Sequence, residues 1–508
     1  MNALNNTLGD EYNVSMTENG ALGYKTTQHP ILDMNFKVNS YRKMSEDAIV
    51  SDFINAFNED PVLAVKWVFF ARDAREGLGE RRLFRVIMKT IAKSEPEMVK
   101  KLLPIVAEYG RWDDVLELYH IPSVRKDVVA LIKTTLTADM TAMGNNKPIS
   151  LLAKWMPSVN TSSKETVALA RELAKALGVS EKQYRKMLSA LREKLKVVEK
   201  QISANDWGEV NYEAVPSKAN LLYKNAFLKH DEDRRRAFLG ALSKGEVKIN
   251  SSVNFPSDIV HQYLKQGWSY WGSRTFTEDQ TLEGLWRALP DYGLEDTICV
   301  ADGSGSMFNV VDPSSSVQAI EVADALALYC AEHCQGEFKN KYITFSMRPK
   351  LVSLNGGTLA RNLAVALNNN ECADTNVEAV FDLILHTAVA NKMSQDELPK
   401  NILILSDMEF NSCARFDKRL FDTIQKNYRN HGYKVPRLIF WNIASRTGTI
   451  PVKENEMGVA LVSGYSVNTL KMVLGGELDP FKLLVSTLSS KRYDLVDEAL
   501  GVTKERAK

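Results

Sequence analysis

The chain has 508 residues and a net charge of +1, with 64 Lys and Arg against 63 Asp and Glu. Apolar residues make up 44% and charged residues 25%, a globular composition that excludes collagen-like, disulfide-scaffold and predominantly disordered chains. This length predicts two or three domains.

Residues 1–45 are polar and rich in Asn, Thr and Gly, and no sustained periodicity runs through them, so we expect an N-terminal arm. The beginning of the chain lacks the basic and apolar regions of a secretory signal, and no uncharged stretch is long enough for a membrane span. The five cysteines form no CxxC pair, which is typical of reduced thiols. We therefore expect a cytoplasmic protein that does not engage a membrane.

Residues 46–290 show helical periodicity almost throughout, with apolar residues recurring three and four positions apart. The connections are short, which predicts that successive helices pack antiparallel. No strict repeat of 34 or 40 residues is visible, so this domain is best described as an irregular, HEAT-like helical-repeat array. The periodicity alone does not decide whether the array closes into a ring.

Residues 151–250 carry 19 Lys and Arg against 12 Asp and Glu, a basic excess compatible with a polyanionic partner such as RNA. Many of these cations belong to a predicted helix over 181–201, where Arg185 and Arg192 share a face because they are seven positions apart. A solvated helix whose glutamates pair with the cations explains the same pattern, and Trp155 and Trp207 nearby fit a core better than a base-stacking surface. The candidate RNA-binding residues are Lys154, Lys182, Arg185, Lys186, Arg192 and Lys196.

From residue 291 the pattern changes to short buried strands that alternate with amphipathic helices. Such alternation predicts a doubly wound, mostly parallel α/β domain over 291–508. The expected fold class is therefore an N-terminal all-α array followed by an α/β domain.

Polar side chains follow the predicted strands of this α/β domain. Asp302, Ser304 and Ser306 come at the end of the first strand, Thr375 precedes a helix, and Asp407 ends the strand over 401–406. Ligands of open parallel sheets bind at the carboxyl ends of the strands, so these five side chains are expected to converge. Carboxylate and hydroxyl oxygens suit Mg²⁺ or another divalent cation.

This Asp-x-Ser-x-Ser motif, with a Thr and a second Asp on later loops, resembles the metal-ion-dependent adhesion site of von Willebrand factor A domains. The resemblance implies that Asp302, Ser304, Ser306, Thr375 and Asp407 hold the ion directly or through water. It also implies that a partner supplies a carboxylate or a phosphate to the open coordination position, a protein carboxylate being the expected case.

A helical array followed by such a domain resembles the Ro autoantigen family, whose helical part is the TROVE module. The stretches RDAREGLGER (72–81), GRWDD (110–114) and AKWMPS (153–158) are most similar to a Ro-like subgroup of uncharacterised plant, fungal and phage proteins. In Ro proteins the helical repeats form a ring that binds small noncoding RNAs and the single-stranded 3′ ends of misfolded RNAs. The resemblance thus implies a ribonucleoprotein with RNA as the partner.

Catalysis is not indicated by the motifs. Ser304 lacks the glycines two positions before and after it that a nucleophile elbow requires, no phosphate-binding P-loop occurs, and no acid–base or nucleophile set is visible in the spacing. We therefore expect a binding protein and not an enzyme. The alternative is a protein-interaction scaffold that uses the metal site for adhesion without binding RNA.

Overall fold

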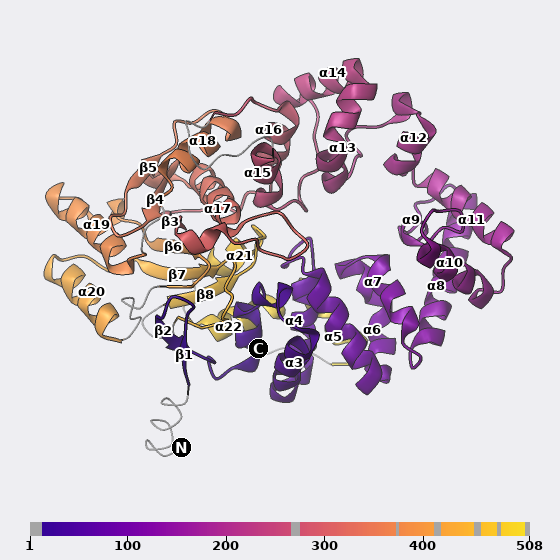
Figure 1. Ribbon diagram of the computed structural model, residues 1–508, viewed down its shortest axis with the longest axis horizontal. Coiled ribbons are helices and arrows are strands. Elements are labelled where there is room, and N and C mark those ends of the chain that lie inside the picture. The colour runs from indigo at the N-terminus through magenta and orange to yellow at the C-terminus, as the bar shows by residue number, and fades with distance from the viewer. Residues whose placement is uncertain are drawn as a thin grey trace. The chain divides into compact units, whose positions relative to one another are not determined.

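The computed structural model describes residues 13–265, 275–371, 375–410, 418–451, 459–474 and 479–502 (Figure 1). The chain divides into two compact units. The α/β unit combines the described residues of 1–67 and 251–490, and the helical unit combines those of 68–250 and 491–508.

The helical unit is an all-α array in which helices adjacent in sequence pack together, as α5 with α6 and α13 with α14. Serine caps begin two of its helices, because the Ser163 and Ser180 hydroxyls accept hydrogen bonds from backbone N–H groups in the first turn. Helix α4 (Pro61–Arg72) enters this unit from the α/β unit. The other helices in order are α5 (Arg81–Ser94), α6 (Pro96–Tyr109), α7 (Trp112–Glu117), α8 (Arg125–Gly144), α9 (Leu152–Trp155), α10 (Lys164–Ala176), α11 (Glu181–Lys194), α12 (Val198–Ala204), α13 (Ser217–His230) and α14 (Glu232–Ser243).

The C-terminal helix α23 (Asp494–Leu500) also belongs to the helical unit, where it packs on α6. Just before it, Nε of Arg492 lies 2.7 Å from Oδ2 of Asp73, and the ring of Tyr493 stacks on that of Tyr109 at 5.7 Å between centroids. This corrects the prediction that the α/β domain runs through 508. Periodicity does not show on which unit a terminal helix packs.

The α/β unit contains a six-stranded sheet of order β5-β4-β3-β6-β7-β8, in which only the β4–β5 pair is antiparallel. The residues of β3 are all buried, as expected for a parallel strand covered on both faces. The predicted class, an all-α array followed by an α/β sheet domain, is confirmed. The strands are β3 (Thr297–Asp302), β4 (Lys341–Phe345), β5 (Leu351–Ser353), β6 (Asn401–Ser406), β7 (Arg437–Asn442) and β8 (Val459–Ser463).

In the described part of this unit, eight consecutive helices, α15 to α22, accompany the sheet. Helix α17 lies against β3 and β4, α19 against β4, and both α21 and α22 against β8. The helices are α15 (Pro256–Leu264), α16 (Gln280–Arg287), α17 (Ala319–His333), α18 (Leu359–Asn369), α19 (Val377–Ala390), α20 (Lys418–Asn430), α21 (Thr469–Leu474) and α22 (Pro480–Leu488).

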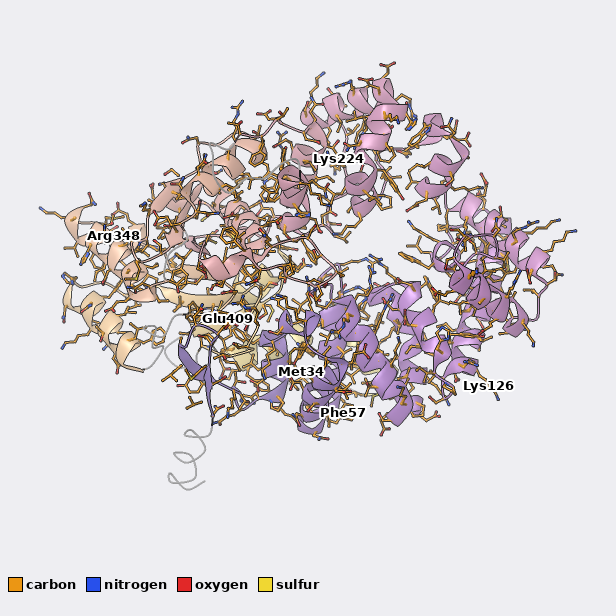
Figure 2. The ribbon with its side chains drawn as sticks, in the orientation of Figure 1. Met34, Phe57, Lys126, Lys224, Arg348 and Glu409 are labelled. Carbon is orange, nitrogen blue, oxygen red and sulfur yellow. The ribbon has the colours of Figure 1, made fainter. Side chains whose placement is uncertain are left out.

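Residues 13–45 are an integral part of the α/β unit, which corrects the predicted arm. Strands β1 (Val14–Met16) and β2 (Leu22–Tyr24) form a hairpin, and α2 (Pro30–Phe36) packs on β8. Met34 of α2, labelled in Figure 2, is buried in this unit, and so is Phe36. The Asn39 amide donates to the carbonyl of Asn442 at 2.7 Å. Polar side chains in this stretch thus bond to backbone groups, so a polar composition did not mean an exposed arm.

The division between the units also differs from the predicted boundaries at 45 and 290. Helix α3 (Glu46–Glu59) packs on α2, and α15 packs on α17, so both belong to the α/β unit. The unit boundaries fall at 67/68, 250/251 and 490/491. Helical periodicity shows that a face is apolar but does not show which element covers it.

The described part of the chain contains no helix that is both long enough and apolar enough to span a bilayer. Cys299, Cys330 and Cys334 are free and buried. Burial raises the pKa of the Cys334 thiol, which disfavours its reactive thiolate.

Candidate functional site

The carboxyl ends of β3 and β6 meet at one edge of the sheet. Strand β3 ends at Asp302 and β6 at Ser406, and Ala301 pairs with Leu405 in the parallel register. The Ser406 hydroxyl donates to Oδ2 of Asp302 at 2.5 Å, and Asp407 follows directly. Neighbouring strands therefore bring both predicted aspartates to the same rim.

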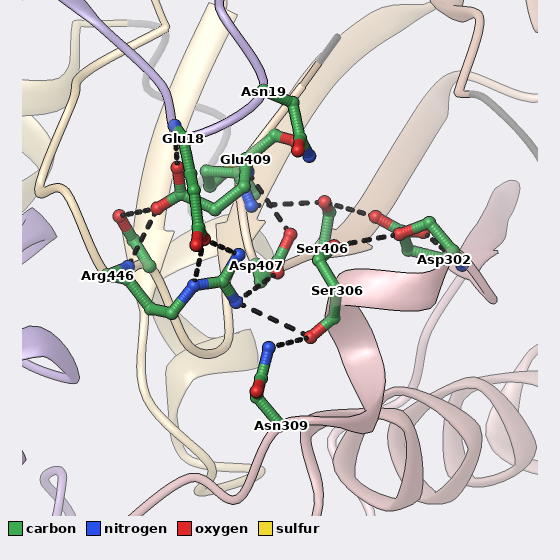
Figure 3. Close-up of polar contacts among 12 residues, drawn as sticks. Glu18, Asn19, Asp302, Ser306, Asn309, Ser406, Asp407, Glu409 and Arg446 are labelled. Carbon is green, nitrogen blue, oxygen red and sulfur yellow. Dashed lines mark hydrogen bonds and ion pairs between the residues drawn. The ribbon is translucent and has the colours of Figure 1, made fainter.

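The loop after β3 adds two hydroxyls to this rim (Figure 3). The backbone N–H of Ser304 donates to Oδ1 of Asp302 at 2.9 Å, which folds the loop back over the carboxylate. The hydroxyl oxygens of Ser304 and Ser306 lie 3.1 Å apart, and Ser306 also hydrogen-bonds to the Asp407 side chain. Four of the five predicted metal ligands thus lie together, and we call Asp302, Ser304, Ser306 and Asp407 the rim site.

Thr375, the fifth predicted ligand, is buried just before α19. It makes no hydrogen bond to the rim site within the described residues. The described residue Glu371 does lie beside the loop, because a Cβ at Gly303 would lie 3.0 Å from the carbonyl oxygen of Glu371. Glycine at this position therefore allows the two backbones to approach each other.

Burial dominates the electrostatics of the two rim aspartates. Desolvation, followed by the charge of Asp407, raises the pKa of Asp302 to about 7, although hydrogen bonds from Ser406 and Ser304 act in the opposite direction. Burial likewise raises the pKa of Asp407, and the positive charge of Arg446 opposes this shift. The protein thus leaves the negative charge of Asp302 only partly compensated, and a bound cation would compensate it.

Arg446 is a residue of this site that the sequence analysis missed. Its Nη1 lies 2.9 Å from Oδ2 of Asp407 and 3.4 Å from the carbonyl oxygen of Ser306, and the guanidinium also pairs with Glu18 (Figure 3). Its backbone N–H donates to Glu409 at 2.8 Å. No motif marks this arginine, but its place shortly after β7, at the same carboxyl edge of the sheet, was a usable signal.

The donor chemistry of the rim fits a hard divalent cation such as Mg²⁺, which prefers carboxylate, hydroxyl and water oxygens. No group of three or more His, Cys, Asp and Glu side chains in the described parts of the chain is arranged to hold a metal. A cation at the rim would therefore depend on the Ser304 and Ser306 hydroxyls and on water as well as on the two aspartates.

The helical unit holds a second candidate site, a groove of about 1130 Å³ lined by residues of α9–α12 and the segments between them. We call it the α9–α12 groove. Lys182 and Lys196, two of the six predicted RNA-binding residues, are exposed outside its lining, while Lys200 adds a cation that the prediction missed. The other four predicted residues line the groove: Lys154, Arg185, Lys186 and Arg192.

The four predicted cations of the groove differ in what they already bind. The guanidinium of Arg192 donates to the carbonyls of Ala153 and Met156 at 2.8 and 2.6 Å and to the hydroxyl of Ser158 at 2.8 Å. Arg192 therefore braces the wall formed by residues 153–158, which differs from the predicted direct contact. Arg185 and Lys186 are exposed on α11.

Two families match the sequence. Residues 17–130 and 122–292 match a domain of unknown function, DUF2828, and residues 296–492 match another, DUF7788. The uncharacterized protein L728 of Acanthamoeba polyphaga mimivirus is 30% identical over 519 residues, which cover 94% of this chain and 87% of the viral protein. The chain belongs to the DUF2828 family. The crystal structure of the Ro (RSR) protein of Deinococcus radiodurans is similar to this DUF2828-family chain with a TM-score of 0.38 at 12% identity, covering 89% of this chain and 93% of the Ro chain.

The two tryptophans near the basic helix have different surroundings in this DUF2828-family protein. Trp207 is buried and stacks on His230 at 4.6 Å between ring centroids, as a core residue does. Trp155 is half-buried and lines the groove, with the guanidinium of Arg111 over its ring at 4.9 Å. Of these two tryptophans, only Trp155 therefore offers an aromatic surface in the groove that Arg185 and Lys186 also line.

Proposed function

We propose that this DUF2828-family protein binds RNA in its α9–α12 groove, while a divalent cation binds at the rim site of its α/β unit. The observation that carries the proposal is the meeting of exposed cations with an aromatic side chain in one groove. Arg185 and Lys186 come from α11 and Trp155 from α9. Cations of this kind neutralise phosphates, and an aromatic ring stacks with unpaired bases.

The chemistry of this groove favours a single-stranded segment over a duplex. The groove is lined by α9 and the segment that follows it together with α11 and α12. Unpaired bases can turn toward Trp155 while the phosphates face Arg185 and Lys186. The sequence resemblance to Ro proteins adds the class of RNA: small noncoding RNAs and misfolded RNAs with a free 3′ tail are the proposed partners, and this role requires binding without catalysis.

At the rim, Asp302, Ser304, Ser306 and Asp407 would hold Mg²⁺, with Thr375 on the neighbouring segment. A bound cation would neutralise the two buried carboxylates and leave a coordination position for a carboxylate of a protein partner. We propose that the rim recruits such a partner to the RNA-bound protein in the cytoplasm.

The RNA proposal is tested by charge reversal within the groove. We expect the double variant R185E/K186E to bind a fluorescein-labelled hairpin RNA with a single-stranded 3′ tail at least about 10-fold more weakly at ~50 mM salt, as measured by fluorescence anisotropy. Removing two phosphate contacts with a single strand should also reduce the slope of log affinity against log salt by about 1.4.

The matched control is K126E/K175E, which makes the same change of charge at two exposed lysines that lie outside the groove and are not among the predicted RNA-binding residues. It should retain nearly wild-type affinity. Equal losses in the two double variants would show that RNA responds only to net charge, and wild-type binding by R185E/K186E would remove the groove from the RNA surface.

A further inference from the structure

A third arrangement of polar side chains lies in the α/β unit, apart from the rim site and the groove, where α15 packs against α17 (Figure 1). Nε2 of His261 lies 2.9 Å from the hydroxyl oxygen of Ser316, and Nδ1 lies 2.6 Å from Oε2 of Glu321. An ionised carboxylate can only accept a hydrogen bond, so Glu321 fixes the imidazole proton on Nδ1. Nε2 is then an acceptor for the Ser316 hydroxyl.

These three residues differ in solvent exposure in the way that general-base catalysis requires. His261 and Glu321 are only 8% and 6% exposed, whereas Ser316 is exposed to solvent. The hydroxyl is therefore accessible to a substrate, while its base and the partner of that base are shielded from water. A histidine–glutamate pair that merely braced two helices would not need an exposed hydroxyl at its second ring nitrogen.

The fold holds each member of the set in place. Glu321 lies in the first turn of α17, where its Oε1 accepts from the backbone N–H of Gln318 at 3.0 Å. The loop that carries Ser316 is closed at its base, because the N–H of Val311 donates to the carbonyl of Val317 at 2.9 Å. The hydroxyl is thus carried by an ordered turn and not by a free loop.

A cavity of about 210 Å³ adjoins this set and is lined by both Ser316 and His261. Its other lining side chains include Leu264 and Ile320, and Ile320 belongs to the first turn of α17. Together with Leu367, these apolar side chains form one part of the lining, and a short acyl chain of an ester would fit against them beside the Ser316 hydroxyl.

We propose that Ser316 is an activated nucleophile that accepts a short acyl group from an ester, with His261 as its general base and Glu321 as the positioning residue. This inference goes beyond the proposed RNA binding and does not depend on it. Sequence spacing could not reveal the set, because His261 lies on a different helix and Ser316 has no nucleophile-elbow motif around it.

The chemical step balances without a further cofactor. Oγ of Ser316 bonds to the carbonyl carbon while its proton passes to Nε2 of His261. The bond from that carbon to the alcohol oxygen then breaks, and the alcohol leaves with the proton from His261. Water completes the cycle by the same route, releasing a carboxylic acid and restoring the serine hydroxyl.

The test uses the full-length protein and a fluorophosphonate probe, which bonds to activated serines with loss of fluoride. We expect stoichiometric labelling that peptide mass spectrometry assigns to Ser316 and that S316A abolishes. S314A is the matched control, since Ser314 is exposed in the same loop but bonds to Asp312, and it should label at the wild-type rate. Absence of labelling at Ser316, or equal labelling at Ser314, would overturn the proposal.

Variants of the other two members separate catalysis from folding. We expect H261Q to slow labelling about 100-fold or more, since general bases contribute at least that much. E321Q should also slow labelling, because the imidazole loses the carboxylate that holds its proton on Nδ1, and E321D, which keeps the carboxylate, should label faster than E321Q. A rate that H261Q leaves unchanged would overturn the proposal, as would equal labelling rates in E321Q and E321D.

Discussion

The Asp302 carboxyl receives hydrogen bonds from Ser304 and Ser406, yet its pKa is raised to about 7 because desolvation and the nearby charge of Asp407 outweigh those bonds. A carboxyl whose pKa is higher in the folded chain than the ordinary 3.8 binds its proton more tightly when folded. Protonation of Asp302 therefore stabilises the cation-free fold, and this contribution is lost as pH rises through about 7. A divalent cation requires the ionised form and reverses the preference.

Mg²⁺ should therefore stabilise the protein at about pH 8, and its effect should fade as pH drops below about 7. At a Mg²⁺ concentration 100 times the dissociation constant the expected gain is about 2.7 kcal/mol, measured as a shift in thermal unfolding. The variant D302N should show no Mg²⁺ shift at either pH, because an amide neither titrates nor carries charge.

The control for this experiment is D396N, which neutralises an exposed aspartate in the short helical turn before β6. It should retain the full Mg²⁺ response. A response that survives in D302N would place the bound cation elsewhere than at the rim.

Arg446 and a bound cation would compensate the same carboxylate. Its guanidinium lies 2.9 Å from Oδ2 of Asp407, and its side chain is 19% exposed. Positive charge at this distance lowers the attraction of Asp407 for a second cation. The arginine would thus limit how tightly the proposed rim site holds Mg²⁺, and its pairing with Glu18 would tie that limit to the N-terminal hairpin.

We expect R446M to bind Mg²⁺ about 10-fold more tightly by titration calorimetry, an increase of about 1.4 kcal/mol. Without Mg²⁺ the same variant should be less stable, because buried carboxylates lose their charge partner. R446K retains the charge and should keep affinity near that of the wild type. Weaker Mg²⁺ binding by R446M would instead show that the arginine supports the site.

At the scale of single elements, α11 has two functions along one face. Its middle exposes Arg185 and Lys186 to the groove, whereas its last turn directs Arg192 into the wall over residues 153–158. The shared face was predictable, because positions seven apart align on a helix. The separate role of Arg192 was not predictable. It depends on carbonyl groups more than thirty residues earlier in the chain, and only the tertiary packing places these groups beside Arg192.

The rim site shows the same limit to what the sequence alone can predict. Convergence of Asp302 and Asp407 follows from the rule that parallel strands end at one edge, so the sequence was sufficient to predict it. Arg446 and Glu18 come from a loop and a hairpin that carry no periodic pattern. The contacts of such segments depend on the packing of the whole unit, which local patterns do not encode.

At the scale of the whole molecule, the change from helical to α/β periodicity near residue 290 coincides with the end of one family match at 292 and the start of the next at 296, whereas the compact units divide elsewhere. The α/β unit takes up residues 13–67 and 251–289 as well as the sheet itself. The helical unit in turn includes α23 from the end of the chain. Each unit is thus completed by a segment distant in sequence, which a linear reading of composition could not assign.

Two buried aromatic residues test this assignment in the intact protein. Phe36 packs in the core of the α/β unit, and Tyr493 stacks on Tyr109 in the helical unit. Replacing a buried aromatic residue by alanine costs about 3–5 kcal/mol. We expect F36A to reduce amide-exchange protection in β7 and β8 and to leave α6 unchanged, and we expect Y493A to have the opposite pattern.

The exposed residues Val14 and Leu222, 42% and 72% exposed, supply matched controls. V14A and L222A should change the free energy of unfolding by less than about 0.5 kcal/mol. If F36A left the protection of β8 at the wild-type level, residues 13–45 would be a dispensable arm after all. Loss of protection in β8 places α2 within the cooperative structure of the sheet, because amide exchange there requires opening of the segment that covers it.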